Sequence, residues 1–364
     1  MTIHPQTERL TAMMNTYTGP KHTVTGVRFA GGQAAYQQAG VPLAGVAPED
    51  VIYEIGSITK VFTAILLCLM IEEGKVDPQA PLREMAPDLG VVPEWITPER
   101  LTSHTSGLPN YYKPLWKAVL NQSADGPYAS FARAELLDWF RNWSGKDPGA
   151  TPRHAYSNLG YGLLGEALAM QTGRPFVDLL TERVIAPLGL QDTTDQLSPE
   201  HLTRFATPRL PKGKPVNPWV FEALAGAGCL KSTGRDLALF SDRVIHAFSS
   251  SSTPLDRAIA RSSTPLVGLG KKGSFQPMAQ AWGWISINYD PAAPGFLFHS
   301  GGTAGSTCGL YICAERAQAC AVLSNNGIAG NLWGSIKLDL SDQPKQAQGY
   351  FTATDTTRAV PLKA

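Results

Sequence analysis

Strand-like segments occur at the two ends of this 364-residue chain, and helix-like segments fill the region between them. Near the N-terminus, residues 23–29 and 33–37 flank the Gly31–Gly32 dipeptide, which is typical of a β-hairpin with a tight turn. Beyond residue 280, four more candidate strands lie at 281–289, 296–299, 307–313 and 319–324. Because both ends of the chain supply strands, we expect them to join in one antiparallel sheet.

Helical patterns dominate the middle of the chain, from about residue 76 to about residue 260. Apolar residues recur at spacings of three and four in candidate helices at 131–143, 159–172, 175–185 and 233–246, and a last helix is expected near 331–340. This order predicts an α/β fold of the α+β sandwich type, in which helices flank an antiparallel sheet and a mostly helical module is inserted.

The length of the chain suggests two domains, since a domain holds roughly 100–200 residues. We expect residues 1–75 and 265–364 to form an α/β domain around the sheet. Residues 76–264 are expected to form a mostly helical domain, with the active site in the cleft between the two.

The charge balance excludes some classes of partner. With 31 Lys and Arg against 30 Asp and Glu, the formal net charge is only +1, and no nucleic-acid partner is expected because affinity for phosphates needs a cationic face. The longest apolar stretch, Val61–Ile71, is far shorter than the roughly 20 residues of a membrane span and is expected to be a buried helix. The first ten residues lack the pattern of an export signal, so a cytoplasmic location is expected, although a chain whose signal had been removed would look the same.

No pattern in the sequence indicates a metal or a cofactor, and neither is expected. The seven histidines form no metal-binding spacing, and His104 is expected to be structural. Two Gly-x-Gly-x-x-Gly matches lack a βαβ surrounding, and no serine lies in Gly-x-Ser-x-Gly. The cysteines form no Cys-x-x-Cys pair, and we expect all five to be buried free thiols: Cys68, Cys229, Cys308, Cys313 and Cys320.

The first candidate for catalysis is Ser57-Ile-Thr-Lys60, at the start of the apolar helix. Side chains three residues apart on a helix are neighbours, so the hydroxyl of Ser57 and the amine of Lys60 share one face of the first turn. Burial is expected to lower the pKa of Lys60, and a neutral amine can take the proton of the serine and make it a nucleophile. The same pair also suits an ordinary helix start, with Ser57 as N-cap and the amine of Lys60 reaching solvent.

A second candidate, Tyr156-Ser157-Asn158, precedes the helix expected at 159–172. Its phenol can relay protons and its amide can hold a substrate carbonyl, although Ser157 or Asn158 can equally cap the helix. A third candidate, His299-Ser300-Gly301-Gly302, ends a strand. Glycines there let a ligand approach the strand edge and accept an N–H at its oxyanion, although a plain glycine-rich turn has the same appearance.

Taken in order, Ser-x-x-Lys, Tyr-x-Asn and His-x-Gly resemble the three motifs of the serine β-lactamase and penicillin-binding protein superfamily. The sequence is similar to its class C branch, which includes class C β-lactamases, DD-peptidases and family VIII esterases. Two further stretches resemble segments of that branch: 101–109 (LTSHTSGLP) and 225–238 (AGAGCLKSTGRDLA). The resemblance runs from about residue 22 to about residue 340.

The resemblance implies a catalytic role for four residues. Ser57 is the nucleophile that becomes acylated, and Lys60 and Tyr156 share the general-base and general-acid work. Which of the two takes the first proton is left open. The backbone N–H groups of Ser57 and Gly302 form the oxyanion hole.

Six further residues are expected to contact the substrate. Asn158 faces it from the second motif, the third motif lines the opposite wall, and aromatic residues near the cleft form either an apolar pocket or buried core. These six are Asn158, His299, Ser300, Gly301, Tyr112 and Trp219.

One position departs from class C β-lactamases, in which the third motif is usually Lys-Thr-Gly. His299 stands where that lysine would be, and a histidine, mostly neutral at pH 7, attracts the carboxylate of a β-lactam less. We therefore expect a serine hydrolase that cleaves a small-molecule ester or amide through an acyl-enzyme on Ser57. The alternatives are a D-Ala-D-Ala carboxypeptidase or weak β-lactamase, an acyltransferase, and a non-catalytic scaffold of the same fold; the oligomeric state is not predicted.

Overall fold

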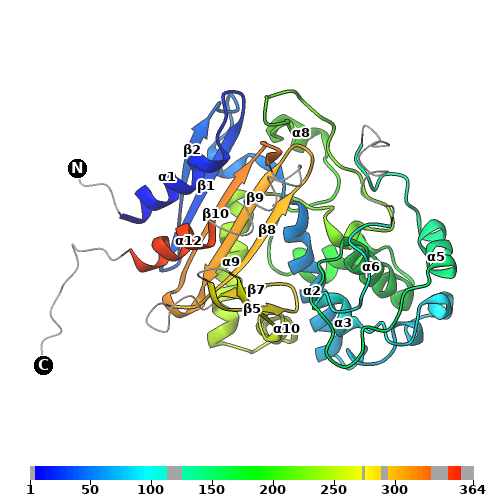
Figure 1. Cartoon of the computed structure of the whole chain (residues 1–364). Coiled ribbons are helices and arrows are strands. Elements are labelled where there is room, and N and C mark those ends of the chain that lie inside the picture. Colours follow the sequence, from blue (N-terminus) through cyan, green and yellow to red (C-terminus); the bar gives the residue numbers. More distant parts are fainter. Residues whose placement is uncertain (1–4, 113–124, 273–274, 288–293, 329–342, 354–364) are drawn as a thin grey trace, which may run out of the picture.

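A computed structural model of the chain describes residues 5–112, 125–272, 275–287, 294–328 and 343–353. Its largest element is an eight-stranded antiparallel sheet with the strand order β2-β1-β10-β9-β8-β7-β6-β5 (Figure 1). The strands are β1 (Thr23–Ala30), β2 (Gln33–Gly40), β5 (Pro265–Lys272), β6 (Phe275–Ala281), β7 (Ile285–Ile287), β8 (Phe296–Gly302), β9 (Thr307–Cys313) and β10 (Gln318–Ser324). Strand β1, from the N-terminal part, pairs with β10, from the C-terminal part, so the predicted joining of the two ends is confirmed.

One predicted turn of the sheet is confirmed, and one turn that was not predicted interrupts a predicted strand. Gly31 and Gly32 both have positive φ angles, 56° and 77°, and close the predicted hairpin of β1 and β2. The single strand predicted at 281–289 is wrong, because the chain leaves β6 at Ala281 and turns at Gly283 before β7 begins. A Cβ on Gly283 would lie 2.7 Å from the Cβ of Ala64, so only glycine permits this close approach of the turn to a helix.

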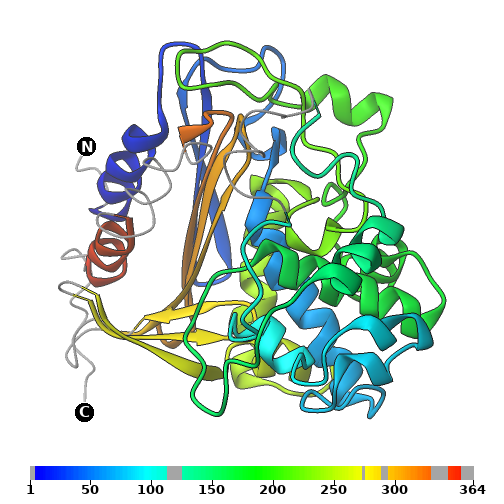
Figure 2. The same ribbon diagram turned by 45° about the vertical axis from the view of Figure 1, so that its right-hand side comes forward.

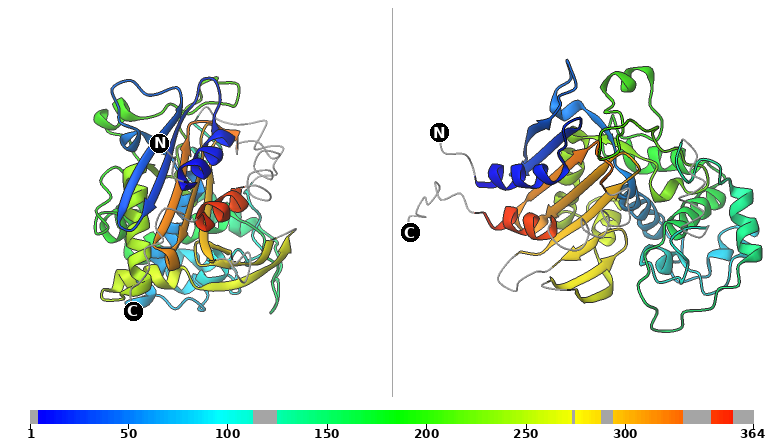
Figure 3. Two further views of the ribbon diagram at one scale, coloured as in Figure 1. Left: turned by 90° about the vertical axis from the view of Figure 1, so that its left-hand side faces the viewer. Right: turned by 45° about the horizontal axis from the view of Figure 1, so that its top comes forward.

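Helices cover both faces of the sheet, so the predicted fold class is confirmed. Helices α1 (Pro5–Tyr17) and α12 (Gln343–Thr352) contact each other on one face (Figure 2, Figure 3). On the other face, α9 (Gly234–Ser249) contacts β1, β9 and β10, and α10 (Pro254–Ser262) packs against α9 and α2 (Thr59–Glu72). The other helices described are α3 (Pro98–Thr102), α5 (Arg133–Asn142), α6 (Asn158–Thr172), α7 (Phe176–Leu180) and α8 (Pro199–Arg204).

The sequence analysis did not predict several of the described elements: α1, α3, α8, α10, α12, β3 (Ile52–Glu54), β4 (Lys231–Thr233), β5 and, apart from Ala281, β6. The helix predicted at 331–340 lies outside the described residues. All five cysteines are buried and free, as predicted. In the part of the chain described here, none of the helices combines the length and apolar character that crossing a membrane requires.

Two hydrophobic clusters lie on opposite faces of the central strands. In β9, Cys308, Leu310 and Ile312 join the larger cluster, whereas Tyr311 and Cys313 join the cluster beneath α1 and α12. Successive residues of a strand point to opposite faces, so a strand buried on both faces has apolar residues at nearly every position. The central strands therefore lie between two hydrophobic layers.

The N-terminal end of α2 meets the C-terminal end of β8. A small sheet of β3 (Ile52–Glu54) and β4 (Lys231–Thr233) leads into one 3-10 turn, η2 (Gly56–Ile58), which precedes α2 and contacts β8 and β9. Every residue of α2 from Thr59 to Met70 is buried. Helices α9 and α10 belong to the middle of the chain and yet pack with the sheet and α2, and the division into 1–75 with 265–364 and 76–264 stays a proposal.

Candidate active site

Three side chains that are far apart in the sequence meet at Ser57. The Ser57 Oγ lies 2.9 Å from the Nζ of Lys60 and 2.9 Å from the phenol oxygen of Tyr156. Ser57 lies in η2, between β3 and α2, and Tyr156 lies in the loop that precedes α6. The amine of Lys60 and the phenol of Tyr156, which the sequence singled out, therefore both lie within hydrogen-bond distance of the Ser57 hydroxyl.

Lys60 is fully buried, and two carbonyl oxygens accept hydrogen bonds from its amine. Its Nζ donates to the Oδ1 of Asn158 at 2.7 Å and to the carbonyl oxygen of Ala227 at 2.6 Å. Burial lowers the pKa of Lys60 well below the usual value of a lysine, as the sequence analysis expected. The Nζ of Lys60 also donates to the Oγ of Ser57, so a charged amine has three acceptors for its three N–H groups. When the amine loses the proton that faces Ser57, its lone pair takes that place.

The second motif is held in place by one contact that the sequence analysis named and by one that it did not. Ser157 is the N-cap of α6, one of the two caps that the sequence allowed, since its Oγ accepts from the N–H of Gly160 at 2.9 Å. Asn158 donates from its backbone N–H and from its Nδ2 to the Oδ1 of Asn110, at 3.1 and 2.9 Å. This pairing turns the carbonyl oxygen of the Asn158 amide toward Lys60. Nothing in the local sequence around Asn110 signals this contact, because it joins two loops 48 residues apart.

The third motif presents a backbone edge to the site. The N–H of Thr303 donates to the carbonyl oxygen of Ser306 in the turn to β9, so the N–H of its neighbour Gly302 points away from β9. Strand β7 pairs only with Phe296–Phe298, so it does not cover that edge of β8 at Gly302. A Cβ on Gly56 would lie 2.7 Å from the nitrogen of Gly302, which places this N–H directly beside the turn that carries Ser57.

His299 is buried and neutral. Its Nδ1 lies 2.6 Å from the carbonyl oxygen of Ser300, an acceptor only, so Nδ1 carries the ring proton. Burial, together with the charge of Lys60, lowers the pKa of His299 to about 3. Strand β8 continues through Ser300 and Gly301, and a Cβ on Gly301 would lie 1.9 Å from the carbonyl oxygen of Ile55, so the glycine permits close packing against the start of η2.

The two aromatic residues selected from the sequence pack within a cluster of rings. Tyr112 stacks on Phe131 with 3.7 Å between ring centroids and donates its hydroxyl to the carbonyl oxygen of Pro127 at 3.0 Å. Trp219 packs edge-on against Tyr128 at 5.5 Å. These contacts favour a packing role for both residues.

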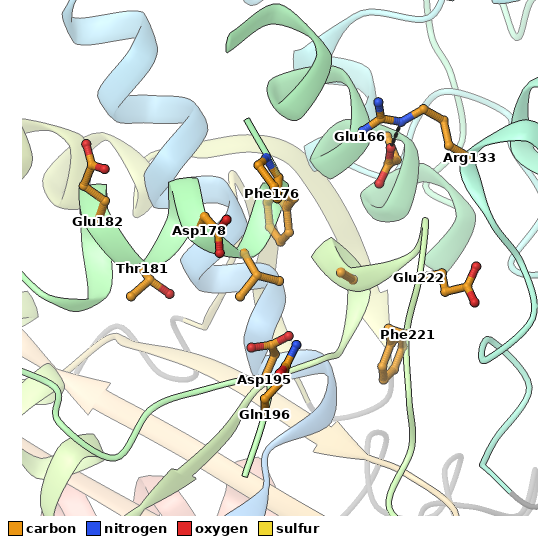
Figure 4. A pocket seen from close by; sticks show the side chains of 13 residues that line it. Arg133, Glu166, Phe176, Asp178, Thr181, Glu182, Asp195, Gln196, Phe221 and Glu222 are labelled. Carbon is orange, nitrogen blue, oxygen red and sulfur yellow. Dashed lines mark hydrogen bonds and ion pairs between the residues drawn. The ribbon is translucent and has the colours of Figure 1, made fainter. Parts of the chain in front are cut away.

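Phe221, another ring of this cluster, packs beside Gly228. A Cβ on Gly228 would lie 3.1 Å from the Phe221 ring and 3.7 Å from the backbone of Gly56, so Gly228 lies between the ring and the turn that carries Ser57. Phe221 also lines an open hollow of about 650 Å³ that is rich in carboxylates and contains the ion pair of Arg133 and Glu166 (Figure 4). None of the three reactive side chains lines this hollow, so we treat it as separate from the site.

Glu54, three residues before Ser57, ties the site together and was also missed. Only 3% exposed, its carboxylate accepts from the N–H of Trp219 and the hydroxyl of Thr303, both at 2.7 Å, and it lies opposite Lys231 in the small sheet. Burial raises the pKa of Glu54, whereas the hydrogen bonds and the charge of Lys231 oppose that rise. The carboxylate thus joins β3 to the turn that follows Gly302.

The Glu54→Gln variant is expected to lower the free energy of unfolding by about 2–3 kcal/mol, because an amide can no longer accept from donors on both sides in a buried site. Urea unfolding followed by circular dichroism measures the change. The exposed Glu84→Gln is the matched control and should stay within about 0.5 kcal/mol of wild type. Equal stability of the two variants would show that the Glu54 network is dispensable.

Comparison with known proteins agrees with the three motifs. The family model for Beta-lactamase matches residues 21–329. The chain is 28% identical over 294 residues to the D-alanyl-D-alanine-carboxypeptidase/endopeptidase AmpH of Escherichia coli (strain K12), which covers 76% of this chain and 72% of AmpH. It is 23% identical over 308 residues to Penicillin-binding protein 4 of Amycolatopsis lactamdurans, covering 80% and 76% of the two chains. It is 27% identical over 245 residues to a Beta-lactamase of Pseudomonas fluorescens, covering 66% and 62%. The resemblance seen in the sequence is confirmed, and the chain belongs to the Beta-lactamase family, whose members are serine hydrolases that act on amide or ester bonds.

Proposed function

We propose that this protein hydrolyses small, uncharged esters or amides through an acyl-enzyme on Ser57. The observation that carries the proposal is the position of the Ser57 Oγ, 2.9 Å from both the buried amine of Lys60 and the phenol of Tyr156. A serine hydroxyl becomes a nucleophile when a neighbouring base can take its proton, and both neighbours are in reach. The roles given below to the individual residues belong to this proposal.

In the acylation step, the Ser57 Oγ attacks the substrate carbonyl and its proton moves to the neutral Nζ of Lys60. The carbonyl oxygen becomes an oxyanion and accepts from the N–H groups of Ser57 and Gly302. The tetrahedral intermediate collapses as the bond to the leaving group breaks, and Tyr156 gives that group its proton. Both Lys60 and Tyr156 donate to the Ser57 Oγ in the resting site, and we assign the first proton transfer to Lys60 because burial lowers the pKa of its amine and favours the neutral form.

Deacylation returns every proton to its starting place. The phenolate of Tyr156 takes a proton from water, and the resulting hydroxide attacks the acyl carbonyl. The ester bond to Ser57 then breaks, and its Oγ recovers a proton from the ammonium of Lys60. Transfer to an alcohol or amine instead of water would follow the same steps and would make the protein an acyltransferase.

The charge of the site favours uncharged substrates. His299 is neutral at physiological pH and Lys60 is buried behind Ser57, so neither offers a fixed cation to a substrate carboxylate. The names of AmpH and Penicillin-binding protein 4 support a second candidate, cleavage of a D-Ala-D-Ala peptide. Rates with p-nitrophenyl butyrate, nitrocefin and a D-Ala-D-Ala peptide separate the candidates, and a preference for the peptide would replace the ester proposal.

Labelling of Ser57 tests the proposed nucleophile directly. After exposure to a fluorophosphonate probe, peptide mass spectrometry is expected to find one adduct, on Ser57. A folded protein that remains unlabelled at Ser57 would contradict the proposal and favour a non-catalytic scaffold.

The pH dependence of hydrolysis should report Lys60. The amine acts only when neutral, so kcat/KM should fall about tenfold per pH unit below the pKa of Lys60 and level off above it. Because burial lowers this pKa well below that of an exposed lysine, the plateau should be reached at a lower pH than an exposed lysine would require. A profile that still rises toward the pKa of an ordinary lysine would show that Lys60 is charged in the resting enzyme.

A further inference from the structure

We propose that His104 is a positioning residue for Tyr156. It forms hydrogen bonds with the residues on either side, Ala155 and Ser157, and its ring packs against the ring of Tyr156. The inference rests on the proposed role of Tyr156 in catalysis. His104 lies in the turn after α3 and is 2% exposed, so it does not itself face a substrate.

Two hydrogen bonds from one residue bracket Tyr156 in the chain. The carbonyl oxygen of His104 accepts from the N–H of Ala155 at 2.8 Å, and its Nδ1 accepts from the N–H of Ser157 at 3.1 Å. The imidazole also lies against the Tyr156 ring, with 4.4 Å between centroids. His104 thus contacts the backbone on either side of Tyr156 and the Tyr156 ring. These contacts restrict movement of the phenol away from Ser57.

The backbone of His104 adopts a conformation that is rare outside glycine. Its φ is 57°, and among the described residues other than glycine only Ala317 shares a positive φ. Histidine, asparagine and aspartate adopt this conformation more readily than other residues, and strained backbone of this kind gathers at functional sites. The strain is held by buried hydrogen bonds, among them that of the Thr105 N–H to the carbonyl oxygen of Arg100 at 2.9 Å.

The imidazole must be neutral to act in this way, because a protonated Nδ1 cannot accept from Ser157. Burial lowers the pKa of His104 well below its usual value, and the neighbouring His154, Lys60 and His299 lower it further. The acceptor therefore persists under the conditions in which a serine hydrolase works.

The other end of the motif is held independently. Asn110 holds the amide of Asn158, and the carbonyl oxygen of Pro109 accepts from the hydroxyl of Ser157 at 2.7 Å. A change at His104 should consequently loosen Tyr156 while leaving the contact of Asn158 with Lys60 in place. This separation makes the inference testable by kinetics.

Two substitutions divide the functions of the imidazole. His104→Asn tolerates the positive φ and places its Oδ1 near the position of Nδ1, so it keeps the acceptor and loses the ring. His104→Phe keeps a ring and leaves the Ser157 N–H without an acceptor. With p-nitrophenyl butyrate, we expect H104F to lower kcat about 10- to 100-fold with KM changed less than about threefold, as a misplaced catalytic group does, and H104N to keep at least about a third of the wild-type kcat.

A double-mutant cycle tells positioning from a general loss of structure. If His104 acts through Tyr156, H104F should cost less than about threefold in a Tyr156→Phe background. Melting temperatures of all variants and the exposed His246→Phe control account for stability. An undiminished effect of H104F in the Tyr156→Phe background, equal losses in H104N and H104F, or full activity of H104F would each overturn the inference.

Amide hydrogen exchange of the peptide that carries residues 155–157 gives a readout that does not depend on activity. Exchange is expected to be faster in H104F than in H104N and wild type. If wild-type protein neither hydrolyses esters nor labels at Ser57, the proposed function fails, whereas unchanged exchange in H104F defeats the positioning role by itself.

Discussion

The Ser57→Ala variant is expected to lower kcat/KM for p-nitrophenyl butyrate by about 10⁴-fold or more, because removal of a catalytic serine leaves only the oxyanion donors and binding to act on the substrate. The missing oxygen lies 2.9 Å from both the Nζ of Lys60 and the phenol oxygen of Tyr156 in the resting site. Lys60 and Tyr156 both remain in S57A, but the hydroxyl that would be deprotonated and attack the substrate is absent. Initial rates against the uncatalysed reaction measure the loss.

The control for S57A is the exposed Ser251→Ala, which should hydrolyse the ester at the wild-type rate. A fluorophosphonate adduct should form on Ser251→Ala and not on S57A. If S57A kept the wild-type rate, the nucleophile would be another residue and the proposed mechanism would fail.

The Lys60→Met variant is expected to lower kcat/KM by about 10²- to 10⁴-fold, the usual contribution of a general base. Methionine fills a similar volume in the buried position but has no lone pair that can take the proton of Ser57. Lys60→Arg should lose as much, because a guanidinium stays charged at any working pH. Stopped-flow acylation and steady-state rates measure the effect, with the exposed Lys21→Met as control.

The Lys60 variants also decide which group takes the first proton. If K60M acylates at close to the wild-type rate while S57A is inactive, Tyr156 is the base, and Tyr156→Phe should then show the large loss in acylation. If K60M acylates slowly and loses the acid limb of the pH profile, Lys60 is the base.

Five strands of the sheet and the reactive pair were predictable because they depend on short-range patterns. Short, largely apolar runs made β8, β9 and β10 visible, and the Gly31–Gly32 dipeptide marked the hairpin of β1 and β2. Ser57 and Lys60 lie three positions apart, so one helical turn alone brings them together. The turn at Gly283 was not visible, since it depends on the close approach of a helix from another part of the chain.

The amino-acid sequence is enough to identify the reactive groups of this protein and their order: a serine and a lysine on one turn, a phenol before a helix and glycines at a strand end. The contacts that hold those groups become visible only in the folded chain. The carbonyl oxygen of Ala227 and the side chains of Glu54, His104 and Asn110 act across loops that are distant in the chain. A backbone acceptor has no residue signature, and a contact between distant loops leaves no periodicity, so burial and hydrogen bonding reveal them only once the chain is folded.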